Sequence, residues 1–166
     1  MATTTIKDIV QQHLDNVKAG IAQRMAQQGR NASGRSVASL NVVATDDGGS
    51  LEGSSSFLAM ENGRGPGKVP YDFVSIIRDW IVAKGISYQD MIPKNGTPEQ
   101  GLKRLSGAIA YSIIKNGTKL YRDNGYNDIF TSVLEEEMEK MSNEIAGVYD
   151  LAVDALHNDN KDNEIK

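Results

Sequence analysis

Side chains that commonly perform catalysis are scarce in this sequence. It contains two histidines, His13 and His157, and no cysteine. A histidine-centred catalytic group, a two-histidine metal site and a thiolate ligand set are therefore disfavoured. Four carboxylates are nearly consecutive, at Glu135, Glu136, Glu137 and Glu139. On a helix they would point to several faces instead of converging, so we interpret them as a solvated surface. We predict no enzyme activity, catalytic residue, metal site or cofactor.

A glycine-rich loop is the other segment with the residue types of a ligand site. The segment from Gly63 to Lys68 reads G-R-G-P-G-K. The Walker phosphate loop needs one more residue between its glycines and a hydroxyl residue after the lysine, where this chain has Val69. Pro66 removes a backbone N–H donor, and Lys68 stands where a dinucleotide-binding loop has its last glycine. Nucleotide binding is therefore disfavoured.

The same loop has a constrained backbone. Glycines permit unusual backbone angles, whereas Pro66 and Pro70 fix their own φ and restrict the residues before them. Arg64 and Lys68 add positive charge. Two interpretations stay open: a connector that delivers the chain to the next helix, or a loop presented to a partner subunit.

Charge is distributed unevenly along a chain whose formal net charge is −4. Residues 60–125 hold ten Lys and Arg against six Asp and Glu, whereas residues 126–166 hold three against eleven. A basic middle and an acidic end suit a subunit that contacts a copy of itself or a neighbouring ring. The alternative, favoured on this observation alone, is a solvated acidic helix face.

A long helix is predicted at the N-terminus. Apolar residues recur every three or four positions, at Ile6, Val10, Leu14, Val17, Ile21 and Met25. Such spacing is typical of one buried helix face. Thr3 to Thr5 offer N-caps and Gly29 a stop. His13 falls beside the apolar stripe, so we interpret it as a boundary residue.

A β-hairpin is predicted next. Ser36 to Thr45 is rich in β-branched residues, and the turn residues Asp46 to Gly49 follow. Ser50 to Ser56 would return as a weak or edge strand, because it is rich in serine and glycine. The loop from Glu61 to Pro70 then leads to a second helix. Its apolar face consists of Phe73, Ile76, Ile77, Trp80 and Ile81, and Gly85 stops it.

Two more helices complete the prediction. Thr97, Pro98 and Gln100 combine an N-cap, a first-turn proline and a capping box, and Gly117 ends that helix. The last helix, residues 127–156, has the heptad spacing of Leu134, Met138, Met141, Ile145, Val148, Ala152 and Ala155. We favour packing of this helix on its own domain over an intersubunit helix.

These elements predict an α+β fold. It is a helix-dominated single domain with a long N-terminal helix, a β-hairpin and three further helices. The domain spans residues 1–157, and the polar tail 158–166 is predicted to be disordered. Neither a signal peptide nor an apolar run that could span a membrane is predicted.

The segment from Phe57 to Ile86 resembles the signature of tailed-bacteriophage tail-completion and neck (head–tail joining) proteins. That signature has an E-x-G-R segment, a P-G-K-x-P turn and a helix that ends in W-I/V-x-x-K-G-I. The matching residues are Phe57, Glu61, Gly63, Arg64, Pro66, Gly67, Lys68, Pro70, Trp80, Ile81, Lys84, Gly85 and Ile86. The motif covers about a fifth of the chain. Tyr71 replaces a second proline that is common in the family, and the acidic last helix is longer than expected.

The resemblance implies a structural virion protein without enzymatic activity, assembled in the host cytoplasm. It implies a ring of six or twelve copies in the neck or tail connector, between the portal and the tail tube. The partners would be further copies, portal or neighbouring neck-ring proteins, and tail-tube proteins. If the ring encircles exiting DNA, the basic residues Arg64, Lys68, Lys103 or Arg104 would face it.

A ring needs two different contact patches on each copy. We predict one patch at the basic loop and the other on the acidic last helix. The predicted interface residues are Glu61, Arg64, Pro66, Lys68, Pro70, Glu135, Glu136 and Glu139. The alternative function is a small nucleic-acid-binding regulatory protein that uses the basic central region.

Overall fold

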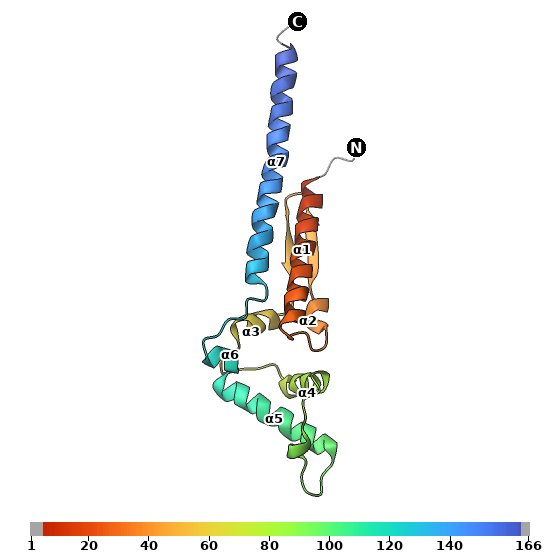
Figure 1. The fold of residues 1–166 in the computed structure, drawn as a ribbon, viewed down its shortest axis with the longest axis vertical. Helices are drawn as coiled ribbons and strands as arrows, with labels where there is room; N and C mark the ends of the chain where they lie inside the picture. Colours follow the sequence, from red (N-terminus) through yellow and green to blue (C-terminus); the bar gives the residue numbers. More distant parts are fainter. Residues whose placement is uncertain (1–4, 164–166) are drawn as a thin grey trace.

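The computed structural model describes residues 5–163, without the side chains of residues 155, 156 and 158–163. It is a helix-dominated α+β fold with an elongated outline (Figure 1). Two long helices, α1 (Ile6–Gln27) and α7 (Thr131–Asn163), lie side by side, and an antiparallel hairpin of β1 (Asn41–Thr45) and β2 (Gly48–Glu52) packs on α1. The remaining elements are α2 (Arg35–Ala38), α3 (Ser56–Asn62), α4 (Phe73–Ala83), η1 (Gln89–Met91), α5 (Pro98–Asn116) and α6 (Lys119–Arg122).

The predicted helix ends are confirmed where the sequence has capping residues. Thr5 caps α1 in a capping box with Asp8, and Thr97 caps α5 in a box with Gln100. Gly29 and Gly117, at the ends of these two helices, both have positive φ. The other two candidate caps, Thr3 and Thr4, lie outside the described residues. Local hydrogen bonds fix these ends, and for that reason the sequence reveals them.

The hairpin is present, but its strands are shorter than predicted. Residues 35–38 form the helical turn α2, so β1 begins only at Asn41. The turn has two residues, because the ladder continues until Thr45 pairs with Gly48. The return strand ends at Glu52, and Ser56 already begins α3. Serine and glycine disfavour a long strand, as expected from their low strand propensity.

Helix α3 was not predicted from the sequence. It has seven residues, too few to display a helical period in the sequence. Tertiary burial stabilises it instead. Its Phe57 side chain enters a hydrophobic cluster together with Val17 and Ile21 of α1 and Val133 of α7.

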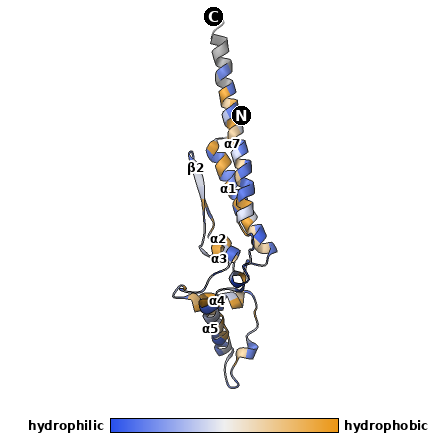
Figure 2. Cartoon of the chain, turned by 90° about the vertical axis from the view of Figure 1, so that its left-hand side faces the viewer, coloured by the Kyte–Doolittle hydropathy of each residue, from blue (hydrophilic) through white to orange (hydrophobic). Residues whose placement is uncertain are grey.

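The apolar side chains gather in two clusters. The first belongs to the α1–α7 body, by which we mean residues 5–62 and 126–163. Its buried members are Val17, Ile21, Met25, Leu40, Phe57, Ile129 and Val133. The second belongs to the α4–α5 lobe, residues 73–116, where Ile77, Ile81 and Ala110 are buried. Of the predicted apolar face of α4, Ile76 and Trp80 remain exposed. Figure 2 shows apolar residues along α4 in this lobe.

Helix α7 differs from the prediction at both ends. It begins at Thr131 instead of residue 127, and it continues to Asn163, beyond the predicted end at Leu156. The helix therefore includes residues 158–163 of the predicted polar tail, whereas residues 164–166 lie outside the described part. Its final turns rise past the N-terminal end of α1 (Figure 1). Within residues 5–163, no helix has the length and apolarity needed to cross a bilayer.

Candidate subunit-interaction site

Glu61 lies inside the protein instead of on its surface. The residue is 0% exposed. The Tyr126 hydroxyl donates to Glu61 Oε1 over 2.7 Å, the Phe130 backbone N–H donates to Oε2 over 3.1 Å, and the Thr131 hydroxyl also donates to Oε1. The Asn127 N–H donates to the Glu61 carbonyl over 2.9 Å. The carboxylate thus joins α3 to the segment that leads into α7.

This position gives Glu61 a structural role. Its negative charge sits at the N-terminus of α7, where unpaired backbone N–H groups and the helix dipole favour an anion. Our prediction that Glu61 belongs to a partner interface is therefore wrong for this structure. The sequence could not reveal the burial, because the three donors lie 65 to 70 residues further along the chain.

Gly63 and Arg64 fasten the loop to the α5–α6 junction. The Arg64 N–H donates to Thr118 Oγ1 over 2.9 Å, and the Thr118 N–H donates to the Arg64 carbonyl over 2.8 Å. Gly63 has a φ of +78°, and a Cβ there would lie 2.4 Å from the Tyr121 backbone nitrogen. Gly117 approaches from the other side, where a Cβ would lie 2.7 Å from the Arg64 carbonyl oxygen. Both contacts require glycine.

The Arg64 side chain closes the loop on itself. Its guanidinium lies 5.7 Å from the centre of the Phe73 ring and donates to the Lys68 carbonyl. Arg64 is half-buried, whereas Pro66, Lys68 and Pro70 are exposed. The residues that remain available to a partner are therefore those at the tip of the loop. Their contact with another subunit stays a prediction.

The acidic residues of α7 divide into two groups. Glu135, Glu136 and Glu139 are exposed, as their interpretation as a solvated or partner-facing surface requires. Glu137 instead points toward α1, where His13 Nδ1 lies 2.9 Å from its Oε2. Glu144 lies on the same side, 2.9 Å from His13 Nε2. Our interpretation of Glu137 as part of the solvated group is wrong.

His13 thus sits buried between two carboxylates. Burial lowers the pKa of His13, but the hydrogen bonds to Glu137 and Glu144 outweigh burial, so its pKa is raised overall. The hydrogen bond from Lys140, together with that from His13, lowers the pKa of Glu137 to about 2. A protonated His13 can donate to both carboxylates at once, and a neutral ring cannot. His13 therefore links α1 to α7 and is more than a boundary residue.

The spacing of Glu137 and Glu144 could have revealed this link. The two residues are one heptad apart and lie on the face of α7 that also carries Met141 and Val148. Charged residues at such positions usually have a partner on the facing helix.

Thr118 could also have been recognised as the N-cap of a short helix, because its side chain accepts from the Tyr121 N–H. No local signal indicated Tyr126.

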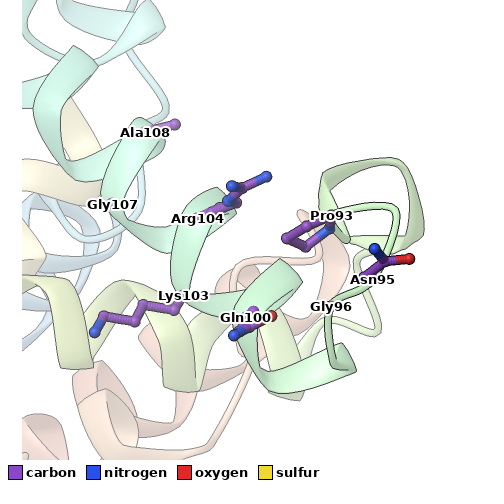
Figure 3. Close-up of a pocket in the computed structure, with 8 residues that line it drawn as sticks. All are labelled: Pro93, Asn95, Gly96, Gln100, Lys103, Arg104, Gly107 and Ala108. Atoms are coloured by element: carbon purple, nitrogen blue, oxygen red, sulfur yellow. The ribbon is translucent and has the colours of Figure 1, made fainter.

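Three of the ten basic residues of the middle segment lie on α5, namely Lys103, Arg104 and Lys115. Lys103 and Arg104 are both exposed and border a shallow hollow of about 600 Å³. The loop with Pro93, Asn95 and Gly96 forms its opposite edge, and Figure 3 shows Arg104 projecting outward beside Gly107 and Ala108. In the described part of the chain, no group of three or more potential ligand side chains is arranged to hold a metal ion.

Comparison with protein-family models, curated proteins and solved structures finds no match for this chain. The functional argument therefore depends on the residues themselves.

Proposed function

We propose that this protein is a structural virion subunit of a tailed bacteriophage, located in the ring that joins head and tail. One observation carries the proposal, namely the resemblance of residues 57–86 to the signature of tail-completion and neck proteins. It would be assembled in the host cytoplasm and act without cofactor or catalysis.

The geometry of the motif supports this proposal. Glu61, Gly63 and Arg64 form contacts within the chain, so they fix the shape of the loop. Lys68 and Pro70 are left exposed at its tip. The buried residues of the motif thus fix the backbone of the loop, and its exposed residues are available to a partner. This arrangement suits a subunit of a ring, because every copy must present the same contact surface.

The charge distribution gives a second line of support. The basic loop around Lys68 and the exposed Glu135, Glu136 and Glu139 of α7 have opposite charge, as two patches of a heterologous ring contact would need. The proposed partners are five or eleven further copies, the portal or neighbouring neck rings, and the tail tube. Lys103, Arg104 and Lys68 are the candidates for contact with exiting DNA.

Quantitative mass spectrometry of purified virions tests the proposal. We expect the chain in mature particles at six or twelve copies per portal ring, with cross-links to portal or tail-tube proteins. Empty heads that lack tails provide the matched control for head-bound material. Absence of the chain from both particles would contradict a structural virion role.

A second candidate function, nucleic-acid binding, has one observation in its favour. Residues 92–122 contain six Lys and Arg against a single acidic residue, Glu99. Fluorescence anisotropy with a labelled duplex would test it. Phosphate contacts would make the affinity fall steeply with salt concentration, and binding without salt dependence would argue against this use of the basic residues.

A further inference from the structure

The C-terminal part of α7 extends beyond the rest of the body. The 33 residues of α7 and the 22 of α1 give helix lengths of about 50 and 33 Å. Ile6 at the start of α1 and Tyr149 of α7 border the same groove. The contact between the two helices therefore ends near Tyr149, where α1 begins. From Asp150 the helix continues to Asn163 past the end of α1 (Figure 1). We call residues 149–154 the α7 overhang.

The overhang is apolar on more than one side. Tyr149, Leu151 and Val153 are exposed, and Leu151 keeps 72% of its surface accessible. Tyr149 and Val153 are four residues apart and share one face of the helix, whereas Leu151 lies on another, so the apolar side chains occupy two sides of the helix. Exposed apolar groups of this kind are typical of a surface that a partner covers. Asp150 and Asp154 occupy the remaining side and are also exposed.

An exposed face with the opposite charge lies at the other end of the molecule. On α5, Arg104, Ala108, Tyr111 and Lys115 follow one another at spacings of four, three and four residues, and all are exposed. We call these four residues the α5 face. Tyr111 is 65% accessible, and Lys115 Nζ lies 6.0 Å from the centre of its ring. Gly107 and Ala108 leave room for a helix to approach, beside the hollow seen in Figure 3.

The overhang and the α5 face complement each other. Helix α7 contains nine Asp and Glu against two Lys, whereas residues 92–122 have the opposite imbalance. Both surfaces also present apolar groups, Leu151 and Val153 on one and Tyr111 on the other. Nucleic-acid phosphates would pair with Arg104 and Lys115, but they would leave the overhang uncovered. A second copy of this chain accounts for both surfaces.

The two surfaces cannot meet within one chain, because they lie at opposite ends of the elongated molecule (Figure 1). The exposed surface is 11409 Å². A compact monomer of 18.1 kDa would expose about 8,100 Å². The excess is large enough to include an interface of ordinary size.

We propose that the α7 overhang of one copy docks on the α5 face of the next copy, with Asp150 and Asp154 opposite Arg104 and Lys115. Such a contact is heterologous, so repeated copies close into a ring or continue as a filament. The contact itself follows from the two surfaces, and its closure into a ring rests on the proposed virion function. This contact is a second pair of patches, in addition to the loop around Lys68 and the exposed Glu135, Glu136 and Glu139.

Sedimentation equilibrium of the full chain and two variants tests the contact. Wild type should associate in a concentration-dependent manner. Arg104→Glu/Lys115→Glu and Leu151→Ser/Val153→Ser should each weaken association at least tenfold while circular dichroism stays unchanged. The control Lys7→Glu/Arg78→Glu makes the same charge change at two exposed positions outside both surfaces and should associate like wild type.

Two combinations identify the contact as heterologous. An equimolar mixture of the two variants should form dimers and no larger species, since each variant keeps one intact surface. Adding Asp150→Lys/Asp154→Lys to the Arg104→Glu/Lys115→Glu chain should restore association, because the charges are exchanged. A wild type that stays monomeric at every concentration would overturn the proposal, as would variants that associate like wild type or lose only DNA binding.

Failure of this proposal is distinguishable from failure of the proposed function. If the chain is found in virions but the charge exchange restores nothing, the contact is wrong and the virion role stands. If the exchange restores association but the chain is absent from virions, the contact stands and the virion role is wrong.

Discussion

The α1–α7 body and the α4–α5 lobe differ in how much of their apolar surface the chain itself covers. In the body, Val17, Ile21 and Ile129 are almost fully buried between two long helices and a hairpin. In the lobe, two helices pack on each other, and only Ile77, Ile81 and Ala110 of its cluster are buried. The lobe contacts the body through polar groups, including a salt bridge of 3.6 Å between Arg35 and Asp79.

This difference shows which hydrophobic cluster the chain itself encloses and which cluster it encloses only in part. A cluster with three buried residues covered by half-exposed neighbours excludes little water, so it contributes less stability and opens at lower free energy. The buried cluster of the body is enclosed by the chain's own helices and hairpin, and the α7 overhang is the part of the body that stays exposed. The basic α5 face belongs to the lobe, and the predicted contact loop directly precedes it in the chain. Both would gain stability from a partner.

Matched core substitutions should give the largest effects and test the comparison directly. Ile21→Ala should lower the free energy of unfolding by about 4 kcal/mol, because it leaves a cavity in a well-enclosed cluster. Ile81→Ala should cost about 2 kcal/mol, because its surroundings collapse more easily. Urea denaturation measures both values. Hydrogen exchange should show lost protection throughout the body for the first variant and only in α4 and α5 for the second. Equal and global loss in both would contradict the comparison.

Removal of the buried carboxylate should have the next largest effect. Glu61→Ala leaves the Tyr126 hydroxyl, the Thr131 hydroxyl and the Phe130 N–H without their acceptor, which should cost about 3 kcal/mol. Thermal unfolding measures the change. Glu135→Ala, an exposed carboxylate on α7, is the control and should alter stability by no more than about 0.5 kcal/mol. Equal effects of the two substitutions would exclude a capping role for Glu61.

A smaller loss is expected at the junction between body and lobe. Gly63→Ala forces a positive φ on a residue with a Cβ and drives that atom into the Tyr121 backbone, at a cost of about 2 kcal/mol. The control is Gly67→Ala, where φ is +120° but no atom lies within 4 Å of the added Cβ. Gly67→Ala therefore reports backbone strain alone. If both variants lose the same stability, the close approach to Tyr121 contributes nothing.

The smallest effect depends on pH and is confined to the body. The raised pKa of His13 gives stability that is fully present below its ordinary value of 6.5 and is lost as pH rises through the raised value. The lowered pKa of Glu137 gives stability present above 4.5 and lost as pH falls toward about 2. His13→Gln should therefore lose most stability between pH 4.5 and 6.5, by about 1.5 kcal/mol.

Chemical denaturation at a series of pH values from about 4 to about 9 would measure this dependence. The control variant is His157→Gln, because His157 is an exposed histidine on α7. The control should follow wild type at every pH. A His13→Gln deficit that does not shrink above the raised pKa would show that packing, not charge, links α1 to α7.

Sequence patterns succeeded here wherever one segment contains all of its own determinants. The N-cap at Thr5, the capping box at Thr97 and the helix ends near Gly29 and Gly117 depend on residues a few positions apart, and these predictions were confirmed. The apolar stripe of α1 likewise follows from its own spacing. The helix-dominated α+β class was predictable for the same reason. Short helices such as α3 were missed because one or two turns show no period.

Tertiary structure alone decided what the candidate site residues do. The sequence by itself determined that a loop with glycines, prolines and two cations precedes α4. It could not determine that Glu61 is buried and Lys68 exposed, because burial depends on Tyr126, Phe130 and Thr131 arriving from a distant segment. The division of the α7 carboxylates between His13 and solvent has the same origin. Hydrogen bonds between residues far apart in the chain carry no local pattern, and only folding brings their partners together.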